Sequence, residues 1–137
     1  LHHTRHGISP DSLEKIILDW SKHIQGSEFI ADDYTVTTET EKTGDLIYLD
    51  PPYFHTKGRY YGTIDFDAFL SYLEKLNSKG IKYILSFDGI RGENDFTVEL
   101  PKELYKRHEF IPSGNSSFKK VMDKERVQVL ESLYLNW

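Results

Sequence analysis

Four consecutive residues, Asp50-Pro51-Pro52-Tyr53, combine groups that can hold a planar amine. Asp50 and Pro51 each precede a proline, which forces extended backbone angles, and the prolines themselves have a fixed φ and no N–H. The segment is therefore a stiff bend that presents a carboxylate and backbone carbonyls, all of them hydrogen-bond acceptors. Tyr53 adds a flat aromatic surface. Acceptors beside a stacking surface suit a planar ligand with an exocyclic amino group; the alternative is a turn with no chemical role.

The residues around this motif predict the elements that position it. Residues 46–49 form a short apolar run that ends at the prolines, which predicts a buried strand. A helical pattern over residues 65–79 and a second apolar run at 81–87 predict a helix and a parallel neighbouring strand. Strands that alternate with helices predict an α/β fold, with a largely parallel sheet and helices on both faces. Ligands bind at the carboxyl ends of such strands, which is where Asp50 lies.

The flanking segments predict further elements of a single domain of 137 residues. Ser9-Pro10 predicts the start of a helix that ends at Gly26. Residues 110–111 and 127–137 predict strands, because they are apolar or alternate between apolar and polar side chains.

The composition excludes several classes of protein. Cysteine is absent, which excludes disulfides, thiolate zinc sites and cysteine nucleophiles. No apolar run is long enough to predict a membrane span, and no metal site is expected. The net charge is −5, but residues 102–126 contain seven Lys or Arg against four Asp or Glu. That local excess permits a nucleic-acid surface, although an ordinary solvated surface of mixed charge is the favoured explanation.

The motif and its surroundings resemble the Dam-like DNA adenine-N6 methyltransferases. Before the motif, the resemblance includes Gly44-Asp45-Leu46-Ile47-Tyr48-Leu49. After the motif, it continues through Tyr60-Tyr61-Gly62, the helix at 66–80 and Ile84-Leu85-Ser86-Phe87-Asp88-Gly89. It ends with Glu131-Ser132-Leu133-Tyr134-Leu135-Asn136 and covers about residues 28–137. The resemblance implies the C-terminal portion of a Rossmann-like methyltransferase sheet, in a bacterial cytoplasmic enzyme that acts on double-stranded DNA in restriction-modification or a related process.

The resemblance also implies a mechanism. Asp50 and the Pro51 carbonyl would accept the two N6 hydrogens of adenine, so that the nitrogen lone pair points at the methyl group of S-adenosylmethionine. Fixed acceptors would stabilise the positive charge that develops on N6. The adenine must leave the duplex to reach them, and Tyr53 would stack on the flipped base, with Pro52 completing the motif. Cofactor contacts are expected from Asp50, Tyr53 and Asp33.

Other residues are weaker candidates. Lys57, Arg59, Tyr60 and Ser116 are expected to contact DNA, and a plain solvated loop is the alternative for each of them. Ser86 and Asp88, at the end of the second predicted strand, could line the pocket or simply cap the strand.

One part of the family pattern is absent from this sequence. The family has a glycine-rich cofactor loop, Phe-x-Gly-x-Gly, before its catalytic motif, and no such loop occurs here. We therefore expect a fragment or one half of a split enzyme, with an upstream half that carries the cofactor loop. The helix within residues 1–27 would then come from the end of the target-recognition region.

Two other functions remain open at the level of sequence. The chain could methylate an amino group of RNA or N4 of cytosine, although Asp50 argues against cytosine because those enzymes usually have Ser at that position. Alternatively, it could be a DNA-binding or assembly subunit that keeps the fold without catalysis.

The absent loop gives a first prediction. We expect this chain by itself to bind S-adenosylmethionine weakly or not at all, which isothermal titration calorimetry measures directly. Tight binding at one cofactor per chain would contradict the expectation of a fragment.

Overall fold

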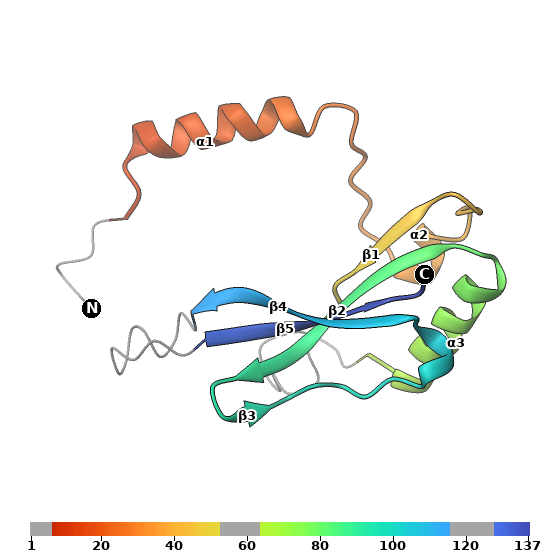
Figure 1. Cartoon of the computed structure of the whole chain (residues 1–137). Coiled ribbons are helices and arrows are strands. Elements are labelled where there is room, and N and C mark those ends of the chain that lie inside the picture. Colours follow the sequence, from red (N-terminus) through yellow and green to blue (C-terminus); the bar gives the residue numbers. More distant parts are fainter. Residues whose placement is uncertain (1–6, 53–63, 116–127) are drawn as a thin grey trace. The chain divides into compact units, whose positions relative to one another are not determined.

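The computed structural model describes residues 7–52, 64–115 and 128–137 (Figure 1). The chain divides into two compact units, residues 1–37 and 38–137, which are considered separately. In chain order the elements are α1 (Pro10–His23), α2 (Tyr34–Thr37), β1 (Leu46–Leu49), α3 (Phe66–Ser78), β2 (Lys82–Arg91), β3 (Asn94–Asp95), the 3-10 helix η1 (Lys102–Leu104), β4 (Arg107–Asn115) and β5 (Gln128–Leu135).

The first unit contains the helix expected at Ser9-Pro10. Ser9 caps α1, because its side chain accepts a hydrogen bond from the backbone N–H of Ser12 at 3.3 Å, and Pro10 occupies the first helical position. The helix ends before Gly26, which has a φ of +80° that glycine adopts without strain. The prediction of this helix is confirmed.

The second unit is a sheet with strand order β1-β2-β5-β4, in which β3 pairs with the far end of β2. β1 and β2 are parallel neighbours, with Leu46 opposite Lys82 and Leu49 opposite Leu85, as the two apolar runs predicted. The helix α3 connects them. Asp65 caps that helix by accepting a hydrogen bond from the backbone N–H of Ala68 at 3.1 Å.

The rest of the sheet corrects the expectation of a largely parallel arrangement. β5 runs antiparallel to both of its neighbours, β2 and β4, and β3 is antiparallel to β2. The prediction extended the one helix-linked pair to the whole sheet. Strands that return directly alongside a neighbour run antiparallel, whereas a parallel pair requires a long crossover. The outcome is a mixed α/β sheet that is mostly antiparallel.

The hydrophobic core lies between α3 and one face of this sheet. The helix contributes Phe69, Tyr72, Leu73 and Leu76, and β2 contributes Tyr83, Leu85 and Phe87, all of them buried. The other face was expected to carry helices as well. Within the described part of residues 38–137, no second helix covers it, and Leu46 and Tyr48 on β1 remain 57% and 61% exposed.

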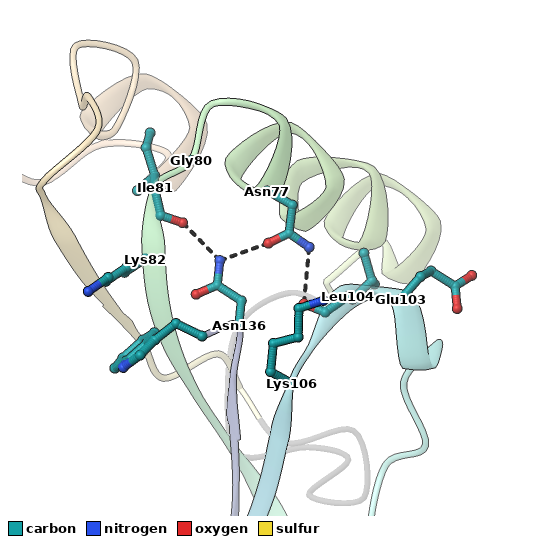
Figure 2. A pocket seen from close by; sticks show the side chains of 9 residues that line it. Asn77, Gly80, Ile81, Lys82, Glu103, Leu104, Lys106 and Asn136 are labelled. Atoms are coloured by element: carbon teal, nitrogen blue, oxygen red, sulfur yellow. Dashed lines mark hydrogen bonds between the residues drawn. The ribbon is translucent and has the colours of Figure 1, made fainter.

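A polar network fastens the sheet to the end of α3 (Figure 2). Asn136 accepts a hydrogen bond from the Tyr83 N–H at 2.8 Å and donates to Asn77 at 2.7 Å and to the Ile81 carbonyl at 2.9 Å. The Tyr83 hydroxyl donates to the Leu104 carbonyl, and burial raises the pKa of Tyr83 to about 12. A pocket of about 350 Å³ lies beside this network. The amide side chains of Asn77 and Asn136 are already hydrogen-bonded to one another, so the network serves the fold.

A β-bulge interrupts the pairing of β2 and β5 between Phe87 and Ile90. Gly89 lies within it, and a Cβ at this position would lie 2.3 Å from the Leu130 carbonyl oxygen. The Gly89 carbonyl accepts a hydrogen bond from the Phe96 N–H at 2.9 Å. Only glycine permits the two strands to approach this closely.

This contact predicts the effect of adding one methyl group. Gly89→Ala should lower the free energy of unfolding by about 1–3 kcal/mol, because the backbone of β5 must move away from the new Cβ. Urea denaturation measures the change. Gly7→Ala is the control, since nothing lies within 4 Å of that position, and it should stay within about 0.5 kcal/mol of the unsubstituted protein. Equal stability of the two variants would show that the close approach is wrong.

Candidate active site

Three of the four motif residues, Asp50, Pro51 and Pro52, lie in the described part of the chain and follow the carboxyl end of β1. Leu49 is buried and ends the strand, whereas the side chain of Asp50 is exposed. Because β1 and β2 are parallel, the residues that follow Leu85 on β2 lie at the same end of the sheet. The structure thus places an acidic acceptor at the carboxyl ends of the parallel strands, where such sheets bind their ligands.

A hydrogen-bond chain reaches the Asp50 carboxylate from two neighbouring side chains. The Ser86 hydroxyl donates to Oδ1 of Asp50 at 2.9 Å, and the Tyr48 hydroxyl donates to Ser86 Oγ at 3.2 Å. Ser86 is only 1% exposed, so it touches Asp50 from within the sheet. From the sequence alone, Ser86 was expected only to line a pocket or to cap the strand. Its contact with Asp50 spans 36 positions and depends on the register of β1 against β2, which no local pattern reveals.

Asp88 is also buried, but its charge is already paired. Its carboxylate lies 2.7 Å from Nη2 of Arg91, three residues later, and it is 5% exposed. The Arg91 guanidinium also lies over the ring of Phe96, 5.7 Å from its centroid. Asp88 therefore serves the fold by holding the end of β2, and the pocket-lining role considered for it has no support from this geometry.

Asp33 belongs to the other unit, so its position is described only within residues 1–37. It accepts hydrogen bonds from the Thr35 hydroxyl and from the Thr35 backbone N–H, the latter at 2.8 Å. These two bonds lower the pKa of Asp33, the hydroxyl having the larger effect. The carboxylate stands just before the short helix α2, as a turn residue would.

Several expected site residues lie outside the described part of the chain. Tyr53, Lys57, Arg59 and Tyr60 fall in residues 53–63, and Ser116 falls in residues 116–127. The structure therefore assigns them no contacts, and their roles stay predictions.

A histidine–serine pair elsewhere in the sheet was not expected from the sequence. Nε2 of His108 on β4 is hydrogen-bonded to Oγ of Ser132 on β5, and the His108 ring stacks on Tyr134 with a centroid distance of 4.2 Å. Burial lowers the pKa of His108. Ser132 is fully buried, so a substrate has no access to its hydroxyl, and the pair joins two strands.

Among residues 7–52, 64–115 and 128–137, no three His, Cys, Asp or Glu side chains gather as a metal site would require. In those ranges, no helix has the length and apolar character needed to cross a membrane.

The chain is similar to a described protein family and to a known methyltransferase. The family described as D12 class N6 adenine-specific DNA methyltransferase matches residues 8–121, a stretch that includes the site at Asp50. The Type II methyltransferase M.FokI of Planomicrobium okeanokoites is 27% identical over 148 aligned residues. That alignment covers 97% of this chain and 22% of M.FokI, so the chain spans about a fifth of the length of this relative.

The Asp88–Arg91 pair gives a prediction about stability. Arg91→Ala should lower the free energy of unfolding by about 1–3 kcal/mol, because it leaves a buried carboxylate without its charged partner. Arg107→Ala is the matched control: Arg107 and Glu109 are both 53% exposed and 3.6 Å apart, so their contact should contribute less than about 1 kcal/mol. Chemical denaturation compares the two, and an equal loss in both variants would contradict the assignment of Asp88 to the fold.

Proposed function

The chain belongs to the D12 class N6 adenine-specific DNA methyltransferases, and we propose that it contributes the catalytic motif with which the enzyme methylates N6 of a flipped-out adenine in duplex DNA. The match to this family agrees with the resemblance carried by Asp50-Pro51-Pro52-Tyr53. The single observation that supports the proposal best is the placement of Asp50, an exposed carboxylate at the carboxyl end of β1 with one oxygen already held by Ser86.

In the proposed mechanism, acceptors at this edge orient the adenine amino group. The Asp50 carboxylate and the Pro51 carbonyl accept the two N6 hydrogens, which favours a more tetrahedral nitrogen with its lone pair free for attack. As the new carbon–nitrogen bond formed, the methyl–sulfur bond of the sulfonium would break and a neutral thioether would leave. The fixed Asp50 carboxylate would stabilise the positive charge that develops on N6 without reorganising. The methylated nitrogen then releases one proton to solvent. Holding the base in line for attack contributes a further part of the rate.

S-adenosylmethionine would supply the methyl group, already activated as part of a sulfonium. The described residues suit this cofactor in charge, because the end of β1 offers a carboxylate and carbonyls to a positively charged group. We assign cofactor contacts to Asp50, Tyr53 and Asp33. The Asp33 carboxylate already accepts hydrogen bonds from Thr35, which lower its pKa, and it keeps lone pairs for a donor group of the cofactor.

The target adenine would leave the duplex to reach Asp50. Tyr53 directly follows Pro52 in the sequence, and we propose that its ring stacks on the flipped base. We propose that Lys57, Arg59, Tyr60 and Ser116 contact the DNA backbone, since their ammonium, guanidinium and hydroxyl groups are the donors that phosphates accept.

We further propose that this sheet is the C-terminal portion of a Rossmann-like methyltransferase sheet. β1 is an edge strand of the described sheet, so the backbone N–H and C=O groups on its outer side can pair with a further strand. An upstream half carrying the glycine-rich cofactor loop would extend the sheet there. Under this proposal, α1 comes from the end of the target-recognition region.

The name of the relative suggests a biological setting. M.FokI is a Type II methyltransferase, and by likeness to it we propose that this chain acts in restriction-modification in the bacterial cytoplasm. The substrate that we propose is DNA, which the description of the family names, and not RNA.

The proposal predicts the effect of removing the carboxylate. In the complete enzyme, Asp50→Ala should lower the rate of methyl transfer by roughly 100- to 1000-fold, because one preorganised acceptor is lost. Asp50→Asn should also fail, since its amide can turn a donor toward the N6 hydrogens. Tyr53→Phe should keep most of the activity and Tyr53→Ala should lose far more, since stacking contributes about 1–3 kcal/mol per base.

The assay is transfer of tritiated methyl groups to adenine in duplex DNA, with a thermal melt to verify folding. Asp67→Ala is the matched control, because Asp67 is an exposed carboxylate on α3, and it should retain full activity. A near-normal rate for Asp50→Ala would rule out the catalytic assignment. Methylation of RNA but not of DNA would overturn the proposed substrate.

A further inference from the structure

We propose that Ser86, with Tyr48 behind it, is a positioning residue that fixes the Asp50 carboxylate for methyl transfer. The inference rests on the proposed function of Asp50 and deepens it. It concerns two side chains that act through the Asp50 carboxylate, by deciding which of its oxygens is available to the substrate.

The first support is the register of the sheet. Leu49 lies opposite Leu85, so the next residue on each strand, Asp50 and Ser86, stand side by side at the end of the parallel pairing. Ser86 also pairs with Leu133 on β5, which places it on a strand with neighbours on both sides. A side chain on such a strand has a well-fixed backbone. Ser86 is therefore a rigid donor beside the more exposed Asp50.

The second support is the direction of the hydrogen bonds. The Tyr48 hydroxyl donates to Ser86 Oγ at 3.2 Å, so the single hydrogen of Ser86 is directed to another acceptor. Two acceptors are within reach: Oδ1 of Asp50 at 2.9 Å and the Leu49 carbonyl at 3.5 Å. The carboxylate is both closer and charged, and hydrogen bonds to charged acceptors are the stronger ones. The chain of hydrogen bonds therefore runs from Tyr48 through Ser86 to Asp50.

The third support is that the two carboxylate oxygens of Asp50 differ in their hydrogen bonds. Ser86 occupies Oδ1, and no hydrogen bond from the described residues reaches Oδ2. Without Ser86, an exposed aspartate would rotate among several side-chain conformations. With Ser86, one conformation is favoured, and Oδ2 is left as the acceptor for an N6 hydrogen. Ser86 itself is buried, so it acts on the reaction only through Asp50.

The test compares Ser86→Ala with a matched substitution on the neighbouring strand. Ser132 is also a fully buried serine of this sheet, but its hydroxyl bonds to His108. In the complete enzyme, Ser86→Ala should lower kcat about 10-fold while KM for DNA and for S-adenosylmethionine changes less than about 2-fold, because orientation and not binding is lost. Ser132→Ala should leave both constants unchanged.

Two more variants separate positioning from a general structural effect. Ser86→Thr keeps the hydroxyl and should recover most of kcat. Tyr48→Phe removes the hydrogen bond to Ser86 from an exposed side chain, so it should fold normally and lower kcat by about 2- to 3-fold. A kcat of Ser86→Ala equal to that of the unsubstituted enzyme would overturn the inference. An increase in KM with kcat unchanged would also overturn it, as would an equal decrease of kcat in Ser132→Ala.

A second readout does not depend on activity. The ¹³C NMR signal of the Asp50 side-chain carboxyl should shift in Ser86→Ala and stay in place in Ser132→Ala. If the unsubstituted enzyme transfers no methyl group to DNA, the proposed function fails. In that case, an unshifted Asp50 signal in Ser86→Ala overturns the positioning contact as well, and a shifted signal shows that Ser86 holds the carboxylate for some other chemistry.

Discussion

The parallel pairing of β1 with β2 is the constraint on which the site depends. The register from Leu46 opposite Lys82 to Leu49 opposite Leu85 brings the carboxyl ends of both strands to one edge of the sheet. A parallel pair needs a long crossover, and α3 provides it while burying Leu73 and Leu76 against the sheet. The core that stabilises this crossover therefore also determines that Asp50 and Ser86 are neighbours. A shift of one residue in this register would turn the side chains of β1 to the opposite face and break the contact.

β2 carries the core together with two buried polar residues, of which Ser86 belongs to the site and Asp88 to the fold. Tyr83, Leu85 and Phe87 fill the interior, while Ser86 and Asp88, on the same strand, are buried polar residues. Burial of such groups is costly unless each has a hydrogen-bond partner. Ser86 bonds to Asp50, and Asp88 bonds to Arg91. Because these partners are fixed by the sheet, the acceptor at Asp50 is held in place before any substrate arrives, which is the property that electrostatic stabilisation of a transition state requires.

The sequence predicted the parts of this arrangement that depend on local patterns. The apolar runs of β1 and β2, the helix between them and the two prolines after Leu49 are each visible over a few residues, and the structure confirms the parallel pair that they predict. The insertion of β5 between β2 and β4 was not predictable in this way, because alternation of side chains reveals a strand but not its neighbours. The same holds for the contact of Ser86 with Asp50 and of His108 with Ser132, which join residues 36 and 24 positions apart. The bulge at Gly89 depends on the approach of Leu130 from another strand, which a single glycine does not indicate.

The central claim is that Asp50 holds the amino group of a flipped adenine. It is tested most directly by a crystal structure of the complete enzyme with its target duplex and an unreactive analogue of S-adenosylmethionine. Our account predicts the adenine outside the helix, with N6 about 3 Å from an Asp50 oxygen and from the Pro51 carbonyl, and with Ser86 still bonded to the other Asp50 oxygen. An adenine whose N6 is held by other residues, with Asp50 turned away from the base, would contradict it.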